Sequence, residues 1–344
     1  MPFGDIIDRK GLTFCKLGGI HILPGFIYGF GALNVDLIFQ VPGNTVGELP
    51  YRPGCEYVEE PFRAVELLDF LKEKGILQGR HGGGSAANAV VALSRLGVPC
   101  GFIGRVGEDP EGDFLLEALE DVEKEDIVKS GKSGLCITLL LGDSRDRALI
   151  ICPNTNDHLQ YNDLPVEKIK ETARWVHLTS FNGDKPFEAQ CRLIEQLPPR
   201  IKISLDPGLF YARRGLDSLQ PLLRRANYIF PEKDEVELMT GLSWKKGCRE
   251  LLKMGPDVVL CTLGETGVFV LDSSGEFMVS APKVSVVDTT GAGDVFAAGF
   301  IAARWKGCSL KESVKNGVFW ASRSVTGLGR ERYPFLDENG ENNI

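Results

Sequence analysis

Residues 286–300 read Val-Val-Asp-Thr-Thr-Gly-Ala-Gly-Asp-Val-Phe-Ala-Ala-Gly-Phe. In this segment Gly291 and Gly293 lie between two carboxylates, and an apolar, Ala-rich run follows at once. Glycine lets the backbone turn tightly and approach a ligand without an intervening side chain. The apolar run predicts a helix over 291–305, whose first turn would present unpaired N–H groups and the positive end of the helix dipole. The segment therefore predicts an anion site that suits a phosphoryl group.

Asp294 falls within this predicted anion site. A carboxylate would repel a phosphate bound there, so the residue is unexpected unless it removes a proton from a second reactant. We interpret Asp294 as the general base of a phosphotransferase. A structural alternative stays open, in which Asp294 is the acidic N-terminal cap of a buried helix.

The composition limits the classes of protein and partner that need to be considered. The chain has 344 residues, of which 43% are hydrophobic, which is enough for one large α/β domain or two ordinary ones. A net charge of −8 argues against nucleic acid or an anionic membrane as the main partner. Nine cysteines without a Cys-x-x-Cys pair favour free thiols in a reducing cytoplasm, so we expect a cytoplasmic protein. No apolar run approaches the length of a membrane span.

The hydrophobic pattern alternates between strand and helix periods, which predicts an α/β fold with a doubly wound, mostly parallel sheet between helices. A first strand is expected from Phe26 to about Phe39. A helix is expected over 61–74 with Phe62, Val65, Leu68 and Leu71 on one face. Further strands are expected at 100–106, 174–179, 201–206, 227–230, 257–263, 267–271 and 276–280. Further helices are expected near 111–120, 186–197, 244–254 and 310–324.

Two β-like, turn-rich segments interrupt this alternation, at 37–60 and 135–152. They could form a small accessory sheet over one edge of the main sheet. Because the edges of an exposed sheet are free to pair, two copies of the chain could associate there as a homodimer.

Three weaker patterns are candidate binding elements. Asn34 and Asp36 are two residues apart in a strand, so their side chains share a face and could grip vicinal hydroxyls, or they could form a turn. The run Gly83–Asn88 predicts a close-approach turn that opens a helix, with simple capping as the alternative. The turn from Gly264 to Gly267 could pass under a nucleotide or could be an ordinary hairpin.

Taken together, three motifs resemble the ribokinase-like (PfkB-type) carbohydrate kinases over roughly residues 26–334. The motifs are Gly31-Ala32-Leu33-Asn34-Val35-Asp36; Gly83-Gly84-Ser85-Ala86-Ala87-Asn88-Ala89 with Arg95-Leu96-Gly97 and Gly104-x-Val106-Gly107-Glu108-Asp109; and Asp288-Thr289-Thr290-Gly291-Ala292-Gly293-Asp294. The resemblance implies the family's α/β fold with a small β-lid. The implied division is a lead-in at 1–25, a kinase core at 26–36, 82–134 and 153–334, lid segments at 37–60 and 135–152 with an additional helix at 61–75, and a tail at 335–344.

The resemblance also implies roles for individual residues. Asp294 would be the catalytic base, and the backbone N–H groups of Gly291, Ala292, Gly293 and Asp294 would form the anion hole. The implied sugar contacts are Asn34, Asp36, Gly83, Gly84 and Asn88. The implied nucleotide contacts are Gly264, Gly267 and Asn316, and the implied monovalent-cation ligands are Asp288, Thr290 and Gly327. Where the family often has Asn-x-x-Glu near Mg²⁺, this chain has Glu232 and Glu235, so Glu235 keeps the metal-side position while Glu232 departs from the pattern.

We therefore expect an ATP-dependent sugar kinase that uses Mg²⁺, with a requirement for K⁺ left open. Its small-molecule partner would be a carbohydrate, but the sequence identifies neither the sugar nor the hydroxyl that is phosphorylated. One alternative is a nucleoside kinase on the same fold, with an aromatic clamp from Phe39, Tyr51, Tyr57 or Phe181. A second is a non-catalytic sugar or nucleotide sensor, and a third, more distant one is a nicotinamide-dependent oxidoreductase.

Overall fold

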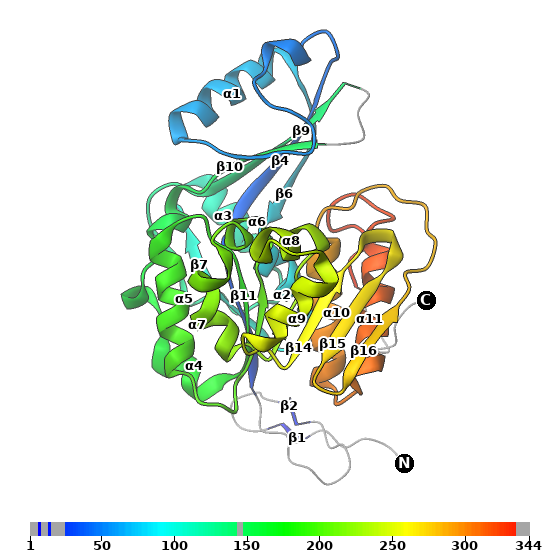
Figure 1. Cartoon of the computed structure of the whole chain (residues 1–344). Helices are drawn as coiled ribbons and strands as arrows, with labels where there is room; N and C mark the ends of the chain where they lie inside the picture. Colours follow the sequence, from blue (N-terminus) through cyan, green and yellow to red (C-terminus); the bar gives the residue numbers. More distant parts are fainter. Residues whose placement is uncertain (1–5, 8–12, 15–24, 143–146, 335–344) are drawn as a thin grey trace.

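The computed structural model describes residues 6–7, 13–14, 25–142 and 147–334. Within them, a nine-stranded sheet lies between layers of helices, and a five-stranded sheet stands beyond one of its ends (Figure 1). A short pair, β1 (Ile6–Ile7) and β2 (Thr13–Phe14), is separate from both sheets. Most of the expected lead-in and all of the expected tail lie outside the described residues. No helix in the described part of the chain is long and apolar enough to cross a membrane.

The large sheet has the strand order β16-β15-β14-β13-β12-β11-β3-β7-β8. Neighbouring strands from β8 to β14 are parallel, whereas β15 and β16 add antiparallel pairs at one edge. The strands are β3 (Phe26–Phe30), β7 (Cys100–Val106), β8 (Ile127–Lys129), β11 (Ala173–Thr179), β12 (Lys202–Asp206), β13 (Tyr228–Ile229), β14 (Val258–Thr262), β15 (Val268–Asp272) and β16 (Gly275–Val279). Most residues of β7 and β11 are buried, as expected for parallel strands covered by helices on both faces.

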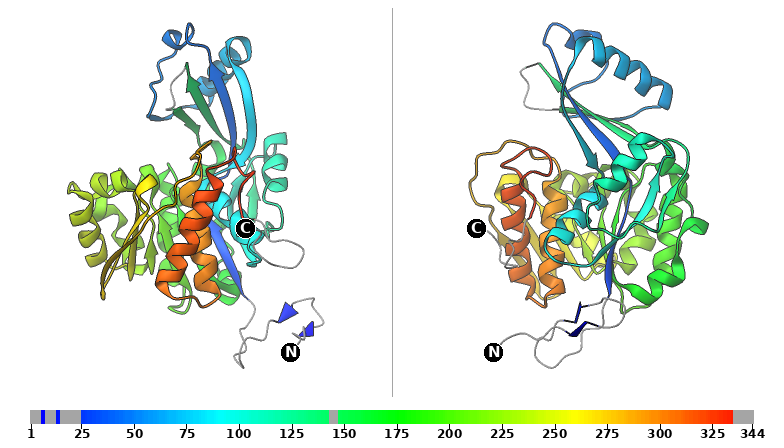
Figure 2. Two further views of the ribbon diagram at one scale, coloured as in Figure 1. Left: turned by 90° about the vertical axis from the view of Figure 1, so that its right-hand side faces the viewer. Right: turned by 180° about the vertical axis from the view of Figure 1, so that it is seen from behind.

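Helices cover both faces of this sheet and enclose two separate hydrophobic clusters. One face carries α2 (Ser85–Arg95), α3 (Pro110–Glu117), α10 (Ala292–Trp305) and α11 (Leu310–Ser324). The other carries α4 (Val166–Thr172), α5 (Asp184–Gln196), α6 (Gly208–Ala212), α7 (Gly215–Arg225), α8 (Lys233–Thr240) and α9 (Trp244–Lys253). Figure 2 shows α10 and α11, in orange to red, packed side by side. The doubly wound α/β fold predicted from the sequence is therefore confirmed.

The small sheet has the strand order β5-β10-β9-β4-β6 and is built from distant parts of the chain. Its strands are β4 (Asn34–Val41), β5 (Glu56–Val58), β6 (Ile76–Gly83), β9 (Gly134–Leu141) and β10 (Arg147–Cys152). A helix, α1 (Pro61–Lys74), packs on it through Leu67 and Leu71. The limits of α1 agree with the prediction, but the predicted apolar face is only partly right. Leu68 and Leu71 pack on the small sheet, whereas Phe62 and Val65 are exposed and Ala64 and Leu67 are buried in their place.

The single strand expected from Phe26 to Phe39 is in fact two strands in different sheets. β3 ends at Phe30 in the large sheet, and β4 begins at Asn34 in the small one. Gly31 lies at the crossing, where a Cβ atom would overlap with Thr179 Oγ1. The close approach to β11 and α2 thus interrupts an apolar run that reads as continuous. β6 was not predicted, because its sequence, Ile-Leu-Gln-Gly-Arg-His-Gly-Gly, has little strand propensity.

His177 is a fully buried titratable group in the centre of the large sheet. Its Nδ1 lies 2.9 Å from Ser204 Oγ, and its Nε2 has no hydrogen-bond partner. Burial lowers the pKa of His177 to about 4, well below the usual value. The unfolded chain therefore binds a proton at this residue at a higher pH than the folded protein does, and acid favours unfolding.

We expect the free energy of unfolding to fall by about 3 kcal/mol from this residue alone as the pH drops from about 6.5 to 4. Urea denaturation of the wild type and of His177→Gln at several pH values tests this, because the variant should lose that part of the pH dependence. His158→Gln is the matched control, since the His158 side chain is exposed. Equal pH slopes in all three proteins would contradict the assignment.

Candidate active site

The first turn of α10 has the geometry of an open helix N-terminus. Gly291 is its N-cap residue with φ of 75°, a left-handed conformation that favours glycine, and no side chain caps the helix. A Cβ atom on Gly291 would also overlap with Oη of Tyr333, which is only 5% exposed. In contrast, a Cβ atom on Gly293 would meet nothing within 4 Å. The turn is therefore tightly supported on one side and open on the other.

Asp294 lies in this first turn and is 7% exposed. Its Oδ2 accepts a hydrogen bond of 2.8 Å from Nδ2 of Asn88, which lies on α2. Burial raises the pKa of Asp294 to about 7, against hydrogen bonds from Asn88 and Ser85 and the charge of Arg330, and the nearby carboxylate of Asp36 raises it further. A carboxyl group with a pKa near neutrality can accept a proton at physiological pH.

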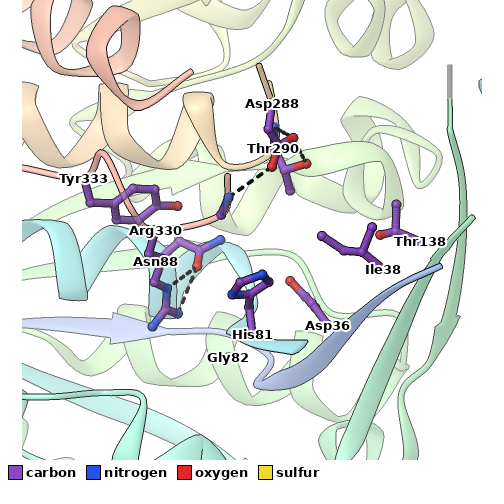
Figure 3. A pocket seen from close by; sticks show the side chains of 11 residues that line it. Asp36, Ile38, His81, Gly82, Asn88, Thr138, Asp288, Thr290, Arg330 and Tyr333 are labelled. Atoms are coloured by element: carbon purple, nitrogen blue, oxygen red, sulfur yellow. Dashed lines mark hydrogen bonds between the residues drawn. The ribbon is translucent and has the colours of Figure 1, made fainter. Parts of the chain in front are cut away.

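A pocket lies between the small sheet and the loops that precede α10 and follow α11 (Figure 3). It is lined by Asp36, Ile38, His81, Gly82, Asn88, Thr138, Asp288, Thr290, Gly329, Arg330 and Tyr333. The structure thus brings together Asp36, Asn88, Asp288 and Thr290, which the sequence predicted as site residues. Burial raises the pKa of Asp36 to about 7, while the charges of Arg330 and Arg147 oppose the shift.

The other predicted sugar contacts surround this pocket without lining it. Asn34 Oδ1 accepts a hydrogen bond of 3.0 Å from Nδ2 of the buried Asn156, so its amide is fixed at the junction of the sheets. Gly83 pairs with Asn34 in the ladder between β4 and β6, and a Cβ atom on it would overlap with the Asp36 carboxylate. Gly84 is the N-cap residue of α2. These residues shape the backbone behind Asp36 and Asn88.

An acidic group lies at the carboxyl ends of β12 and β13. Glu232 and Glu235 form the capping box of α8, in which Glu235 Oε2 accepts a hydrogen bond of 2.9 Å from the Glu232 N–H. Burial, together with the charge of Asp206, raises the pKa of Glu235 to about 9. Burial and the charges of Asp294 and Glu232 in turn raise the pKa of Asp206. The charge of Arg147 lowers the pKa of Glu232, but burial and the charge of Asp234 outweigh it and keep that pKa raised.

These carboxylate oxygens are of the type that Mg²⁺ prefers. Among the described residues, however, no three His, Cys, Asp or Glu side chains converge closely enough to hold a metal ion by themselves. This arrangement suits Mg²⁺, which usually takes one or two carboxylates and completes its shell with water and substrate phosphates.

The predicted nucleotide residues lie on two elements. Gly264 and Gly267 flank the turn η4 (Gly264–Thr266) between β14 and β15. The backbone of Glu232 bridges to Thr262 at the start of this turn, so the turn adjoins the acidic corner. Asn316 is partly exposed on α11, which packs along α10.

The predicted cation ligand Asp288 is already satisfied by groups of the protein. Its Oδ1 accepts hydrogen bonds from Thr290 N at 2.9 Å, Thr290 Oγ1 at 2.6 Å and Arg147 Nη1 at 3.3 Å, and its Oδ2 accepts one from Gly329 N at 3.2 Å. Arg147 Nη1 also donates to Thr290 Oγ1 at 2.6 Å. The guanidinium of Arg147, from the small sheet, thus provides the positive charge beside Asp288. With these partners in place, the Asp288 side chain does not fit the role of a ligand to a monovalent cation. We derive no step through such an ion.

The remaining predicted cation ligand, Gly327, lies in the loop after α11. A Cβ atom there would overlap with the side chain of Arg332. The loop is tied to the segment before α10, because the Val325 carbonyl accepts hydrogen bonds from the N–H groups of Val287 and Asp288. It therefore supports the loop that carries Thr290 and Gly291.

Sequence reasoning missed Arg147, Arg330 and Tyr333, and it also missed the pocket residues Ile38, His81, Gly82, Thr138 and Gly329. Arg147 is the first residue of β10, and Arg330 and Tyr333 follow α11. Arg330 lines the pocket and donates to Asn88, while Tyr333 packs against Gly291. The only signal was a cluster of basic and aromatic residues at 330–333 after a glycine-rich turn. Nothing in that pattern shows which distant side chains they meet.

With this geometry in place, comparison with known proteins is informative. Residues 74–332 match the pfkB family of carbohydrate kinases. The chain belongs to this family. A protein of Archaeoglobus fulgidus described as an uncharacterized sugar kinase is 32% identical over 251 residues, which cover 71% of this chain and 98% of that protein. The aminoimidazole riboside kinase of Salmonella typhimurium is 29% identical over 293 residues, 79% of this chain and 90% of that enzyme.

The crystal structure of adenosine kinase from Sinorhizobium meliloti superposes with a TM-score of 0.80 at 20% identity, covering 89% of this chain and 95% of that one. At this identity the likeness shows the fold alone. As a PfkB-family protein, the chain is a sugar or nucleoside kinase, a phosphotransferase whose acceptor is an alcohol group.

The close packing of Tyr333 on Gly291 leads to a testable prediction. Gly291→Ala should lower the free energy of unfolding more than Gly307→Ala does, because the new methyl group would overlap with Tyr333. Gly307 is a matched control with φ of 83° and open space around it, so its substitution should cost only about 1–2 kcal/mol of backbone strain. Chemical denaturation measures both. Equal losses would show that Tyr333 does not pack closely on this turn.

Proposed function

We propose that this PfkB-family member is an ATP-dependent sugar kinase, with Asp294 as general base and the backbone of Gly291–Asp294 as anion hole. One observation carries the proposal. The Asp294 carboxylate is buried in the first turn of an uncapped helix, and it is hydrogen-bonded to Asn88, which lines a polar pocket. The base and the N–H groups of this turn thus lie within one helical turn, as in-line transfer to a hydroxyl requires. One of these groups, the N–H of Ala292, donates to the Thr289 carbonyl oxygen at 3.2 Å.

The reaction then proceeds in one displacement. Asp294 takes the proton of the acceptor hydroxyl, the hydroxyl oxygen bonds to the γ-phosphorus of ATP, and the bond from that phosphorus to the bridging oxygen of ADP breaks. The N–H groups of the first turn of α10 hold the charge on the transferred phosphoryl oxygens. Preorganised donors of this kind typically contribute on the order of 10²–10³ in rate, and general-base help about 10²–10⁴.

For the acceptor, we assign Asp36 and Asn88 as the side chains that bind hydroxyl groups. Both line the pocket, and together they offer carboxylate and amide oxygens as acceptors and an amide N–H₂ as donor. Asn34, Gly83 and Gly84 hold the backbone that presents these two side chains. The small sheet, including segments 37–60 and 135–152, acts as the lid that excludes water from the pocket.

For the nucleotide, we assign the turn at Gly264 and Gly267, with Asn316 on the adenine side. Glu235 and Glu232 would hold Mg²⁺ together with the phosphates of ATP. When bound, the ion neutralises charge on these phosphates. It would also relieve the repulsion among the carboxylates that raises the pKa of Glu235.

A sugar fits better than a nucleoside because the expected aromatic clamp does not form. Phe39, Tyr51 and Phe181 are 5%, 8% and 1% exposed and pack in hydrophobic clusters, and Tyr57 makes an edge-to-face contact with Tyr51. Of the residues that line the pocket, Tyr333 is the one Phe, Tyr or Trp, and His81 carries the other ring. Tyr333 packs on Gly291, so the pocket has no pair of Phe, Tyr or Trp rings that could clamp a base.

A screen for ADP release over sugars and nucleosides tests both the base and the substrate class. We expect turnover with a sugar, and a loss of at least about 10³-fold in kcat for Asp294→Asn, because the amide cannot accept the proton. Asp217→Asn is the matched control, since Asp217 lies in the first turn of α7 but is exposed. It should keep full activity.

Two results would contradict the proposal. Turnover with nucleosides alone would favour the nucleoside kinase. Activity of Asp294→Asn close to that of the wild type would exclude Asp294 as the base.

A further inference from the structure

Arg330 makes an unusual set of contacts beside the proposed base. Its Nε and Nη2 donate to the same atom, Oδ1 of Asn88, at 3.1 and 2.9 Å (Figure 3). Its Nη1 donates to the carbonyl oxygen of Ala118 at 2.7 Å. Its own carbonyl oxygen accepts a hydrogen bond of 3.1 Å from Arg95 Nη1. In the part of the chain that the structure describes, Arg330 forms no ion pair, so its main side-chain partner near the site is an amide.

These contacts fix the orientation of the Asn88 amide. A guanidinium can only donate hydrogen bonds, so the oxygen of Asn88 must face Arg330. The amide nitrogen must then point the other way, where it donates to Asp294 Oδ2 at 2.8 Å. Without Arg330, the amide is free to rotate and present its oxygen to the carboxylate, a contact that requires Asp294 to be protonated.

We propose that Arg330 is a positioning residue for the base: through Asn88 it orients the Asp294 carboxylate and keeps it ionised. The inference deepens the proposed function and rests on it, since it matters for catalysis only if Asp294 accepts the proton.

The charges around Asp294 show why its ionised form needs a positively charged group nearby. The carboxylate of Asp36 on β4 disfavours the ionised form of Asp294. The charge of Asp294 in turn raises the pKa of Asp206 on β12. Tyr333, in the loop after α11, faces it with a phenol whose own pKa is raised by burial. Arg330 is the positively charged group whose field lowers the pKa of Asp294. Removing it would leave the base among like charges.

The test measures the ionisation of Asp294 directly, without a substrate. The protein is labelled with ¹³C at the aspartate side chains, and the signal of Asp294 Cγ, assigned by its absence in Asp294→Asn, is followed against pH. We expect Arg330→Met to raise the midpoint by about 1 pH unit or more, as the loss of a nearby opposite charge does. Arg332→Met should leave it unchanged, because Arg332 is exposed in the same loop.

Two further variants separate positioning from charge. Arg330→Lys keeps the charge but loses the two-point grip on Asn88, so its midpoint should lie between those of the wild type and Arg330→Met. If Arg330→Met does not fold, this variant carries the test. In an Asn88→Ala background, Arg330→Met should shift the midpoint less than it does in the wild type, because only the direct effect of its charge remains. An unmoved midpoint in Arg330→Met, or in Arg330→Lys if that variant carries the test, would overturn the inference, as would an undiminished shift in the Asn88→Ala background.

The effect of Arg330 on catalysis is measured separately, through the pH dependence of kcat/KM. With the sugar found by the screen, the acidic limb of kcat/KM should move to higher pH in Arg330→Met by the same amount as the Asp294 midpoint. If Asp294→Asn is active, the proposed function fails while the titration still reports on Arg330. If Asp294→Asn is inactive and Arg330→Met leaves the limb unmoved, the inference alone fails.

Discussion

The hydrogen bond between Asn88 and Asp294 is the interaction on which the site depends. It joins two residues that are 206 positions apart in sequence, in the first turns of α2 and α10, which pack together on one face of the large sheet. Each helix begins at a glycine N-cap, which leaves its first turn close to the pocket. The bond thus places the proposed base, the helix N-terminus and a wall of the pocket in one arrangement.

The small sheet completes the pocket with strands from two separate excursions of the chain, β4 to β6 and β9 to β10. After β3 the chain enters β4, which places Asp36 at the pocket. After β6 the chain returns to the large domain through the turn that opens α2. β10 contributes Arg147, whose guanidinium contacts Asp288 and Thr290 just before the start of α10. The small sheet therefore contacts both the proposed acceptor side and the proposed phosphate side of the site.

The sequence predicted well what depends on local patterns. The limits of α1 and β7 agree with their expected ranges, because periodicity and glycine stops define them. The strand from Phe26 to Phe39 was wrong, since only packing against β11 shows that the chain must turn at Gly31. The helix α7 was missed because it contains Pro221. Similarly, Asp36, Asn88 and Asp294 could be predicted from motifs, whereas Arg147 and Arg330 act through contacts that span 141 and 242 residues.

The central claim is that the first turn of α10 receives the phosphoryl group beside its base. A crystal structure with Mg²⁺, a non-hydrolysable ATP analogue and the sugar substrate tests it most directly. The account predicts that the γ-phosphate accepts hydrogen bonds from the N–H groups of Gly291–Asp294, with the acceptor hydroxyl next to the Asp294 carboxylate. A γ-phosphate bound away from this turn, or an acceptor hydroxyl out of reach of Asp294, would contradict it.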